Sequence, residues 1–216
     1  MRFVAELRSL EVFFAWDAHN LSDAGVQHLQ GLQSLREIHI NESKIGDGSL
    51  EVFGGLPNLE DLSIQQNHFT NAGLVHLTRL KHLRELWIGM NDVPYSDDAM
   101  LTLSQLATLE KLDLQSSVLT DAGIQHLAKL QSLRVLLVEG APTHEAETIT
   151  DASVSVLVEM PFLEDLTIRK HSRITDEGMH KLAAMPTMKQ IMVDSTEARG
   201  NIDEELERLY PGLEVR

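Results

Sequence analysis

Histidine is the side chain in this sequence that most readily suggests site chemistry, since the chain has ten histidines and no cysteine. Imidazole binds divalent metals when several ligands converge on one point. His28, His76 and His126 each lie three residues after a glycine, which indicates one recurring position. If this position recurs on stacked strands about 4.8 Å apart, two repeats separate the side chains by about 10 Å. One metal with ligands at about 2.1 Å cannot bridge that distance. We interpret these histidines as consensus residues.

A less favoured metal hypothesis combines His144 with Glu145 or Glu147 and His171, on neighbouring loops. Imidazole with carboxylate suits a divalent metal, but loops carry such residues for solubility as well. No serine lies in a G-x-S-x-G turn and no glycine-rich phosphate-binding loop occurs. We therefore predict no catalytic residue, no metal site, no cofactor and no enzymatic activity.

The elements that position any site are clearest between Leu109 and Leu130. Leu109, Leu112 and Leu114 are spaced three and then two residues apart, which predicts a short strand with one buried face. Thr120 or Asp121 is a candidate helix N-cap, because a short side-chain oxygen can accept the first free N–H groups. An apolar stripe at three-residue spacing follows and predicts a short helix.

Copies of this strand and helix recur along the whole chain, and one unit alone could not bury its apolar face. The strands begin 24 to 30 residues apart, at Leu10, Leu35, Leu59, Leu83, Leu109, Leu133, Leu163 and Met188. Helix starts keep step at Ser22, Thr70, Thr120 and Thr175. A degenerate start lies at Gly46–Ser49, where we expect Ser49 or Asp47 to cap the helix.

The pattern LxxLxL, a loop and then Thr/Ser-Asp-Ala-Gly resembles the leucine-rich repeat family, most closely bacterial repeats related to its cysteine-containing subclass. In that subclass a Cys often follows the strand, where Asn41, Gln66 and Ser116 stand here. The resemblance implies an α/β solenoid, a horseshoe or arc with a parallel sheet on the concave face and short helices on the convex face. We expect one domain over residues 1–216 with about eight repeats, and a C-terminal cap over residues 200–216.

Net charge and composition indicate which kinds of binding partner and which cellular location to expect. The formal net charge of −15 disfavours nucleic acid and anionic membranes, which bind clustered Lys and Arg. No apolar run reaches the roughly 18 to 20 residues that span a bilayer. The first residues are too charged for a signal peptide, and the absence of Cys disfavours a disulfide-capped extracellular protein. We expect a cytoplasmic protein that binds a basic or neutral protein or peptide, with a basic partner favoured.

The predicted strand register places three columns of side chains on the concave face, at the positions between the buried leucines. Glu37, Asp61 and Glu85 stack like charges on adjacent strands, which destabilises the sheet unless a cation relieves it. Trp87, with apolar groups on nearby strands, has the composition of an interface hot spot. The candidate binding residues are Glu37, His39, Asp61, Glu85, Trp87, Lys111, Asp113, Val135 and Leu137.

These residues predict a non-enzymatic protein-interaction module, in which Trp87, Val135 and Leu137 anchor apolar side chains and the acids attract Lys or Arg. An alternative is that Trp87 lies flat across the sheet and Gly89 makes room for it. A different class remains open too: a recognition or regulatory segment of a larger enzyme, such as a ligase or protease.

Two further regions carry hypotheses. Phe14 and Trp16 leave the N-terminal edge apolar, so we expect another domain or a second copy to cover it, unless both rings fold onto the first repeat. Extra residues around Pro94 and His144 lengthen two rim loops, which either contribute to binding or reflect tolerated loop lengthening.

Overall fold

A computed structural model describes residues 2–140, 149–195 and 202–215. The described chain forms one parallel sheet with strand order β1-β2-β3-β4-β5-β6-β8-β9-β10, and β7 pairs with β8 beside this path. The strands are β1 (Val12–Phe14), β2 (Glu37–His39), β3 (Asp61–Ser63), β4 (Glu85–Trp87), β5 (Lys111–Ser117), β6 (Val135–Gly140), β7 (Ile149–Thr150), β8 (Asp165–Arg173), β9 (Gln190–Ser195) and β10 (Glu214–Val215).

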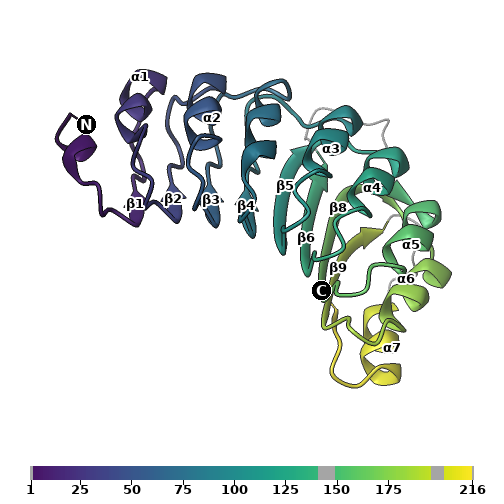
Figure 1. The fold of residues 1–216 in the computed structure, drawn as a ribbon. Helices are drawn as coiled ribbons and strands as arrows, with labels where there is room; N and C mark the ends of the chain where they lie inside the picture. The colour runs from purple at the N-terminus through teal and green to yellow at the C-terminus, as the bar shows by residue number, and fades with distance from the viewer. Residues whose placement is uncertain (1, 141–148, 196–201, 216) are drawn as a thin grey trace.

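Short helices connect the strands and lie on the opposite side of the molecule. They are η1 (Arg2–Glu6), α1 (Asp23–Val26), η2 (Gln27–Leu29), α2 (Asp47–Phe53), η3 (Gly73–Arg79), α3 (Asp97–Leu103), α4 (Asp121–Leu127), α5 (Asp151–Leu157), α6 (Asp176–Ala183) and α7 (Ile202–Leu209), where η marks a 3-10 helix. Figure 1 shows an arc with the sheet on the inner side and the helices on the outer side. The predicted solenoid is confirmed.

The core lies between these two layers and consists of the leucine positions that define the repeat. Leu109, Leu112 and Leu114 are fully buried, and so are the equivalent residues of the neighbouring repeats. Because alternate side chains of a strand point to opposite faces, the residues between them face the concave side. At the end of the described chain β10 pairs with β9 and ends the sheet, and α7 contacts β10 and α6. Residues 200, 201 and 216 of the predicted cap lie outside the described part.

Side chains at the helix starts join consecutive repeats: the carboxylates of Asp23, Asp47, Asp97, Asp121 and Asp151, and the amide of Asn71. Thr120 is the N-cap of α4, and its hydroxyl accepts a hydrogen bond from the Ala122 N–H at 3.2 Å. The same hydroxyl donates to Asp97 Oδ2 of the preceding repeat at 2.7 Å. Asp121, the other candidate, instead accepts bonds from Thr150 of the following repeat. The expectation for the second repeat is wrong, because Gly46 is the N-cap of α2 and Ser49 donates to Asp23.

The chain adopts the left-handed backbone region within or after six of the strands, at Asp17, Glu42, Gln66, Met90, Ser116 and Lys170. Gln66 and Ser116, predicted to occupy the cysteine position, adopt the left-handed backbone region with φ of 54° and 65°. The buried polar side chains lie one or more residues further along, at Ser43, Asn67, Asn91 and Ser117. Asn67 Nδ2 donates to three backbone carbonyls, including that of Ile40 in the preceding repeat, at 2.8 Å. This amide network fixes the spacing of the repeats.

The rim loop around Pro94 turns inward. Tyr95 is fully buried, and its hydroxyl donates to the carbonyl oxygen of Ile88 at 2.5 Å. The longest side chain of this insertion therefore belongs to the core and offers no exposed contact. The second rim loop, with His144, lies outside the described residues. Within the described part of the chain, no helix combines the length and apolar character needed to cross a membrane.

Candidate binding surface on the concave face

The sheet register brings the predicted binding residues together in two neighbouring columns. Glu37 pairs with Asp61, Asp61 with Glu85, Glu85 with Lys111 and Lys111 with Val135. The second column runs His39, Ser63, Trp87, Asp113 and Leu137 in the same order. The register predicted from the leucine spacing is therefore confirmed, whereas the binding role of these residues stays a prediction.

Cations of the chain itself relieve part of the acidic column. Lys111 Nζ lies 2.9 Å from Glu85 Oε1, and Trp87 Nε1 donates to Glu85 Oε2 at 3.4 Å. His39 Nε2 lies 3.2 Å from Asp61 Oδ2, although the two atoms do not have hydrogen-bond geometry. Glu37 forms no ion pair with any described residue. The charge of Glu85 is thus balanced by Lys111, whereas Glu37 and Asp61 remain available to a cation of a partner.

Asp61 is one of two acids of the column that have a buried oxygen without a hydrogen-bond partner among the described residues. In Asp61 this oxygen is Oδ1. Burial raises the pKa of Asp61, His39 opposes this effect, and the negative charges of Glu85 and Glu37 add to it. A buried acceptor without a donor costs about 1–3 kcal/mol. A donor group from a partner would remove that cost.

Asp165 has the same features further along the column, where it pairs with Val135. Its Oδ1 is buried without a hydrogen-bond partner among the described residues. Burial raises the pKa of Asp165, and the nearby charge of Glu214 raises it further. Asp165 is not among the binding residues predicted from the sequence. Its position in the same column as Asp61 was the available signal.

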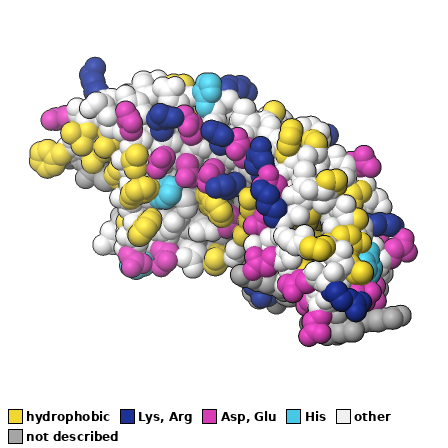
Figure 2. Space-filling model, turned by 90° about the horizontal axis from the view of Figure 1, so that it is seen from below, with side chains coloured by type: hydrophobic (Ala, Val, Ile, Leu, Met, Phe, Trp, Pro, Cys, Tyr) yellow, Lys and Arg dark blue, Asp and Glu magenta, His cyan; other side chains and the backbone are white. Residues whose placement is uncertain are grey.

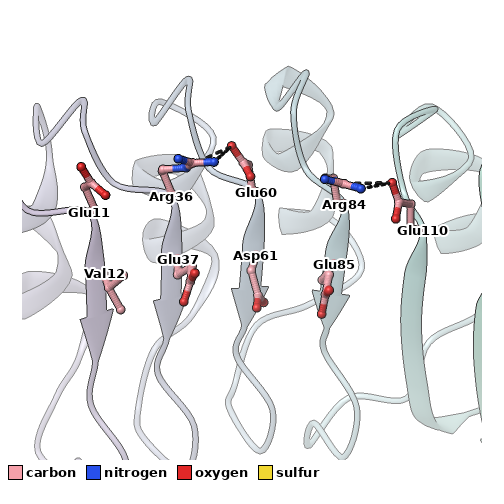
Figure 3. A pocket seen from close by; sticks show the side chains of 9 residues that line it. All are labelled: Glu11, Val12, Arg36, Glu37, Glu60, Asp61, Arg84, Glu85 and Glu110. Carbon is pink, nitrogen blue, oxygen red and sulfur yellow. Dashed lines mark hydrogen bonds and ion pairs between the residues drawn. The ribbon is translucent and has the colours of Figure 1, made fainter.

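A depression of about 460 Å³ lies over the first strands of the concave face. Figure 3 shows that two rows of charged side chains from adjacent strands line it. The lining residues are Glu11, Val12, Arg36, Glu37, Glu60, Asp61, Arg84, Glu85 and Glu110. In Figure 2, acidic and basic side chains alternate over this part of the surface.

The outer row of that depression is a series of alternating charges, which is not among the features predicted from the sequence. From one repeat to the next, the residue before the acidic column alternates between Glu and Arg or Lys: Glu11, Arg36, Glu60, Arg84, Glu110, Arg134, Glu164 and Lys189. Each Arg pairs with the Glu of the following repeat, with N–O distances of 2.6 to 2.8 Å for Arg36–Glu60, Arg84–Glu110 and Arg134–Glu164. We call these residues the charge ladder. The alternation was visible in the sequence.

Asp113 does not serve as the exposed acid that we expected. It is only 1% exposed, so it cannot contact a partner. Its carboxylate accepts hydrogen bonds from Gln65 Nε2 at 2.5 Å and from the Gln115 N–H at 3.0 Å. A Cβ atom on Gly89 would lie 2.8 Å from Asp113 Oδ1. Gly89 therefore makes room for Asp113, not for Trp87 as the alternative held.

Apolar groups flank this buried carboxylate. Trp87, Val135 and Leu137 are each partly exposed on the concave side. The strand that carries Asp113 separates Trp87 from Leu137, which places their backbones about 10 Å apart. Lys111 lies between Glu85 and Val135. The surface thus passes from acids on β2 and β3 to apolar groups on β4 and β6.

The N-terminal edge is apolar and uncovered. Phe3, Phe14 and Trp16 are 86%, 54% and 69% exposed, and Leu7 and Val12 are exposed as well. Phe14 lies 4.5 Å from the His39 ring and 6.1 Å from Trp16, measured between ring centroids. These contacts leave both rings more than half exposed, so they have not folded away onto the first repeat. Figure 2 shows hydrophobic side chains gathered at this end.

The alternative metal site cannot be placed. Residues 144, 145 and 147 and the side chain of His171 lie outside the described part of the chain. Among residues 2–140, 149–195 and 202–215, no group of three His, Asp or Glu side chains is arranged to hold a metal ion.

The fold and this surface define a repeat solenoid with a side-chain array displayed on its concave sheet. A family model described as a leucine-rich repeat region matches residues 1–209. The chain therefore belongs to the leucine-rich repeat family. Such regions are generally protein-interaction modules and are typically non-catalytic.

Two solved structures are similar to this chain. An internalin from Listeria monocytogenes is 20% identical with a TM-score of 0.67, over 98% of this chain and 62% of that one. A TDR receptor is 18% identical with a TM-score of 0.54, over 90% of this chain and 36% of that one. This chain thus spans less than two thirds of either structure. No curated protein sequence matches it.

Proposed function

We propose that this protein is a non-enzymatic interaction module that binds a basic segment of another protein along its concave face. The proposal rests on the Oδ1 of Asp61, which has no hydrogen-bond partner among the described residues and lies beside Glu37, which forms no ion pair with them. A lysine or arginine of the partner would supply the missing donor and oppose the like charges of the column. Charge-assisted hydrogen bonds of this kind are stronger than neutral ones.

The apolar groups give the second half of the contact. Trp87, Val135 and Leu137 would pack against apolar side chains of the partner, since partly exposed aromatic and aliphatic groups with a charged rim are typical of interface hot spots. Asp165 would receive a second cation beyond them. The partner segment would therefore carry basic groups on both sides of an apolar stretch.

Affinity capture from native lysate tests the proposal. Three baits are compared: the wild type, the concave variant Trp87→Ala/Leu137→Ala, and a matched control. The control, Val75→Ala/Leu101→Ala, removes two exposed apolar groups from the helical side. We expect one protein to be retained by the wild type and the control and lost from the concave variant. Retention of the same protein by all three baits would place binding elsewhere.

A second candidate is a recognition or regulatory segment of a larger enzyme, such as a ligase. The apolar N-terminal edge favours it, because an adjoining domain would bury Phe3 and Leu7. The genomic reading frame before Met1 tests this: an in-frame catalytic domain would support it, and a stop codon would contradict it.

Finer proposals follow from the same sequence features. We infer that the repeats are of the bacterial type related to the cysteine-containing subclass, that residues 1–216 act as one domain, and that the protein is cytoplasmic. The acidic charge and the absence of clustered Lys and Arg support a protein partner over nucleic acid or membrane.

A further inference from the structure

The outer edge of β1 has backbone groups that no neighbouring strand uses. In the pairing of β1 with β2, Glu11 O accepts from Glu37 N and Ala15 N donates to His39 O. The N–H and C=O groups of one strand residue point to the same edge, and those of the next residue point to the opposite edge. The N–H and C=O groups of Val12 and Phe14 therefore point away from β2. Figure 1 shows no other strand of the described chain beside β1. These groups can pair with an added strand.

The charge ladder ends on this edge with an unpaired acid. Each Arg of the ladder contacts the Glu of the next repeat, as in Arg36–Glu60 and Arg84–Glu110. Glu11 occupies the Glu position of its repeat, yet no described residue forms an ion pair with it. A parallel strand added beside β1 would complete the ladder if it placed a Lys or Arg next to Glu11.

The concave face of β1 specifies the rest of the added strand. Val12 and Phe14 are exposed and lie on the concave face, beside Glu37 and His39 of β2. Residues opposite them in an added strand would be apolar, because apolar cross-strand neighbours bury each other's surface. Phe13 between them faces the core and is partly buried.

We propose that the edge of β1 binds an extended partner segment with the pattern basic, apolar, any residue, apolar, which adds to the sheet as a parallel strand. Strand addition supplies affinity through main-chain bonds, and side chains at alternate positions supply specificity. This edge adjoins the concave column, since Glu11 and Val12 line the same depression as Glu37 and Asp61. Strand addition would use the outward backbone groups of β1, which the column does not use.

Charge disfavours a second copy as the occupant. No Lys or Arg occurs from residue 9 to residue 35, so the β1 segment of a copy brings no cation to Glu11. Two such edges would pair apolar side chains while leaving both acids unmatched. The occupant is therefore a segment of different sequence.

The test uses two labelled nine-residue peptides that differ in one residue: one has the core Arg-Val-Thr-Val and the other Glu-Val-Thr-Val. Fluorescence anisotropy measures binding to the wild type, to Glu11→Lys and to Glu51→Lys, a matched charge reversal at an exposed site on α2. We expect the wild type and Glu51→Lys to bind the Arg peptide about three- to tenfold more tightly than the Glu peptide. In Glu11→Lys the preference should reverse.

Amide hydrogen exchange locates the peptide. The Arg peptide should slow exchange at Val12 and Phe14, and Val12→Pro should weaken binding because it removes an outward N–H that β2 does not use. Equal affinity for the two peptides, or an unchanged preference in Glu11→Lys, would overturn the proposal. A second result would overturn it too: protection of Val12 and Phe14 from exchange in the absence of peptide, if that protection grows with protein concentration. A second copy would then cover the edge.

Discussion

The carboxylate of Asp113 occupies space that only a glycine in the neighbouring repeat leaves open. Burial raises the pKa of Asp113, while hydrogen bonds from Gln115 and Gln65 lower it and the charge of Glu139 raises it again. Because Gln65 belongs to the repeat before that of Gly89, the carboxylate links three successive repeats. We infer that Asp113 positions the strands under Trp87 and does not contact a partner.

The substitution Gly89→Ala tests this packing. The added methyl would lie 2.8 Å from Asp113 Oδ1 and 3.0 Å from Gln115 Cβ, so one of the side chains must move. We expect the free energy of unfolding to fall by about 1–3 kcal/mol, as measured by urea denaturation.

A double substitution provides the control. Asp113→Ala removes the atom that the methyl would meet, so Gly89→Ala should cost less in that background than in the wild type. Additive losses, or a wild-type stability for Gly89→Ala alone, would show that Gly89 does not hold space for this carboxylate.

At the scale of the elements, aspartates at the helix starts join consecutive repeats. Asp97, Asp121 and Asp151 each accept from the backbone N–H and the hydroxyl of the next repeat's N-cap threonine. The small residue in the next helix start is explained by the same contact: a Cβ on Gly123 would lie 2.3 Å from Asp97 Oδ1. The Asp-Ala-Gly pattern therefore indicates both the start of a helix and a contact between neighbouring repeats.

Among these carboxylates, Asp121 should make stability depend on acid pH. Although burial alone raises the pKa of Asp121, hydrogen bonds from Ser153 and Thr150 outweigh it and lower the pKa below its ordinary value. A lowered folded-state pKa stabilises the fold at pH values above the unfolded-state pKa of about 3.9. That contribution is lost as the pH falls through the folded-state pKa.

We therefore expect Asp121→Asn to lower the free energy of unfolding at pH 7 by about 1 kcal/mol, since the site is partly exposed. Near pH 3 the variant and the wild type should approach each other. Asp98→Asn, an exposed residue of α3, is the matched control and should match the wild type at both values. An Asp121→Asn deficit of the same size at both pH values would contradict the role of the ionised carboxylate.

At the scale of the whole molecule, binding to the concave column should weaken with salt. Exposed charges are screened over about 8 to 10 Å at physiological ionic strength. We expect the dissociation constant of the captured partner, measured by calorimetry, to rise steadily as sodium chloride is added. Glu37→Gln should reduce this dependence, whereas Glu51→Gln on the helical side should not; a salt-insensitive complex would contradict the acidic column.

The leucine spacing was sufficient to predict the sheet, its register and the face on which each strand residue lies, because strand alternation is strict. It could not predict that Asp113 is buried, since that depends on Gly89 across the sheet. Nor could it predict that Tyr95 turns into the core, because the direction of a loop depends on packing rather than periodicity. The column predicted from the sequence included Asp61. That its Oδ1 is buried without a hydrogen-bond donor depends on how neighbouring side chains pack, which the sequence pattern does not give.

The alternation of the charge ladder has a consequence for changes in repeat number. Deleting the single repeat that carries Glu60 would bring Arg36 beside Arg84, and duplicating it would bring two glutamates together. Like charges on neighbouring strands destabilise a sheet. Gain or loss of two adjacent repeats keeps Glu and Arg or Lys alternating, so every Arg still has a Glu in the following repeat. The solenoid should therefore be lengthened or shortened most readily in units of two repeats, although the leucine pattern repeats with every single unit.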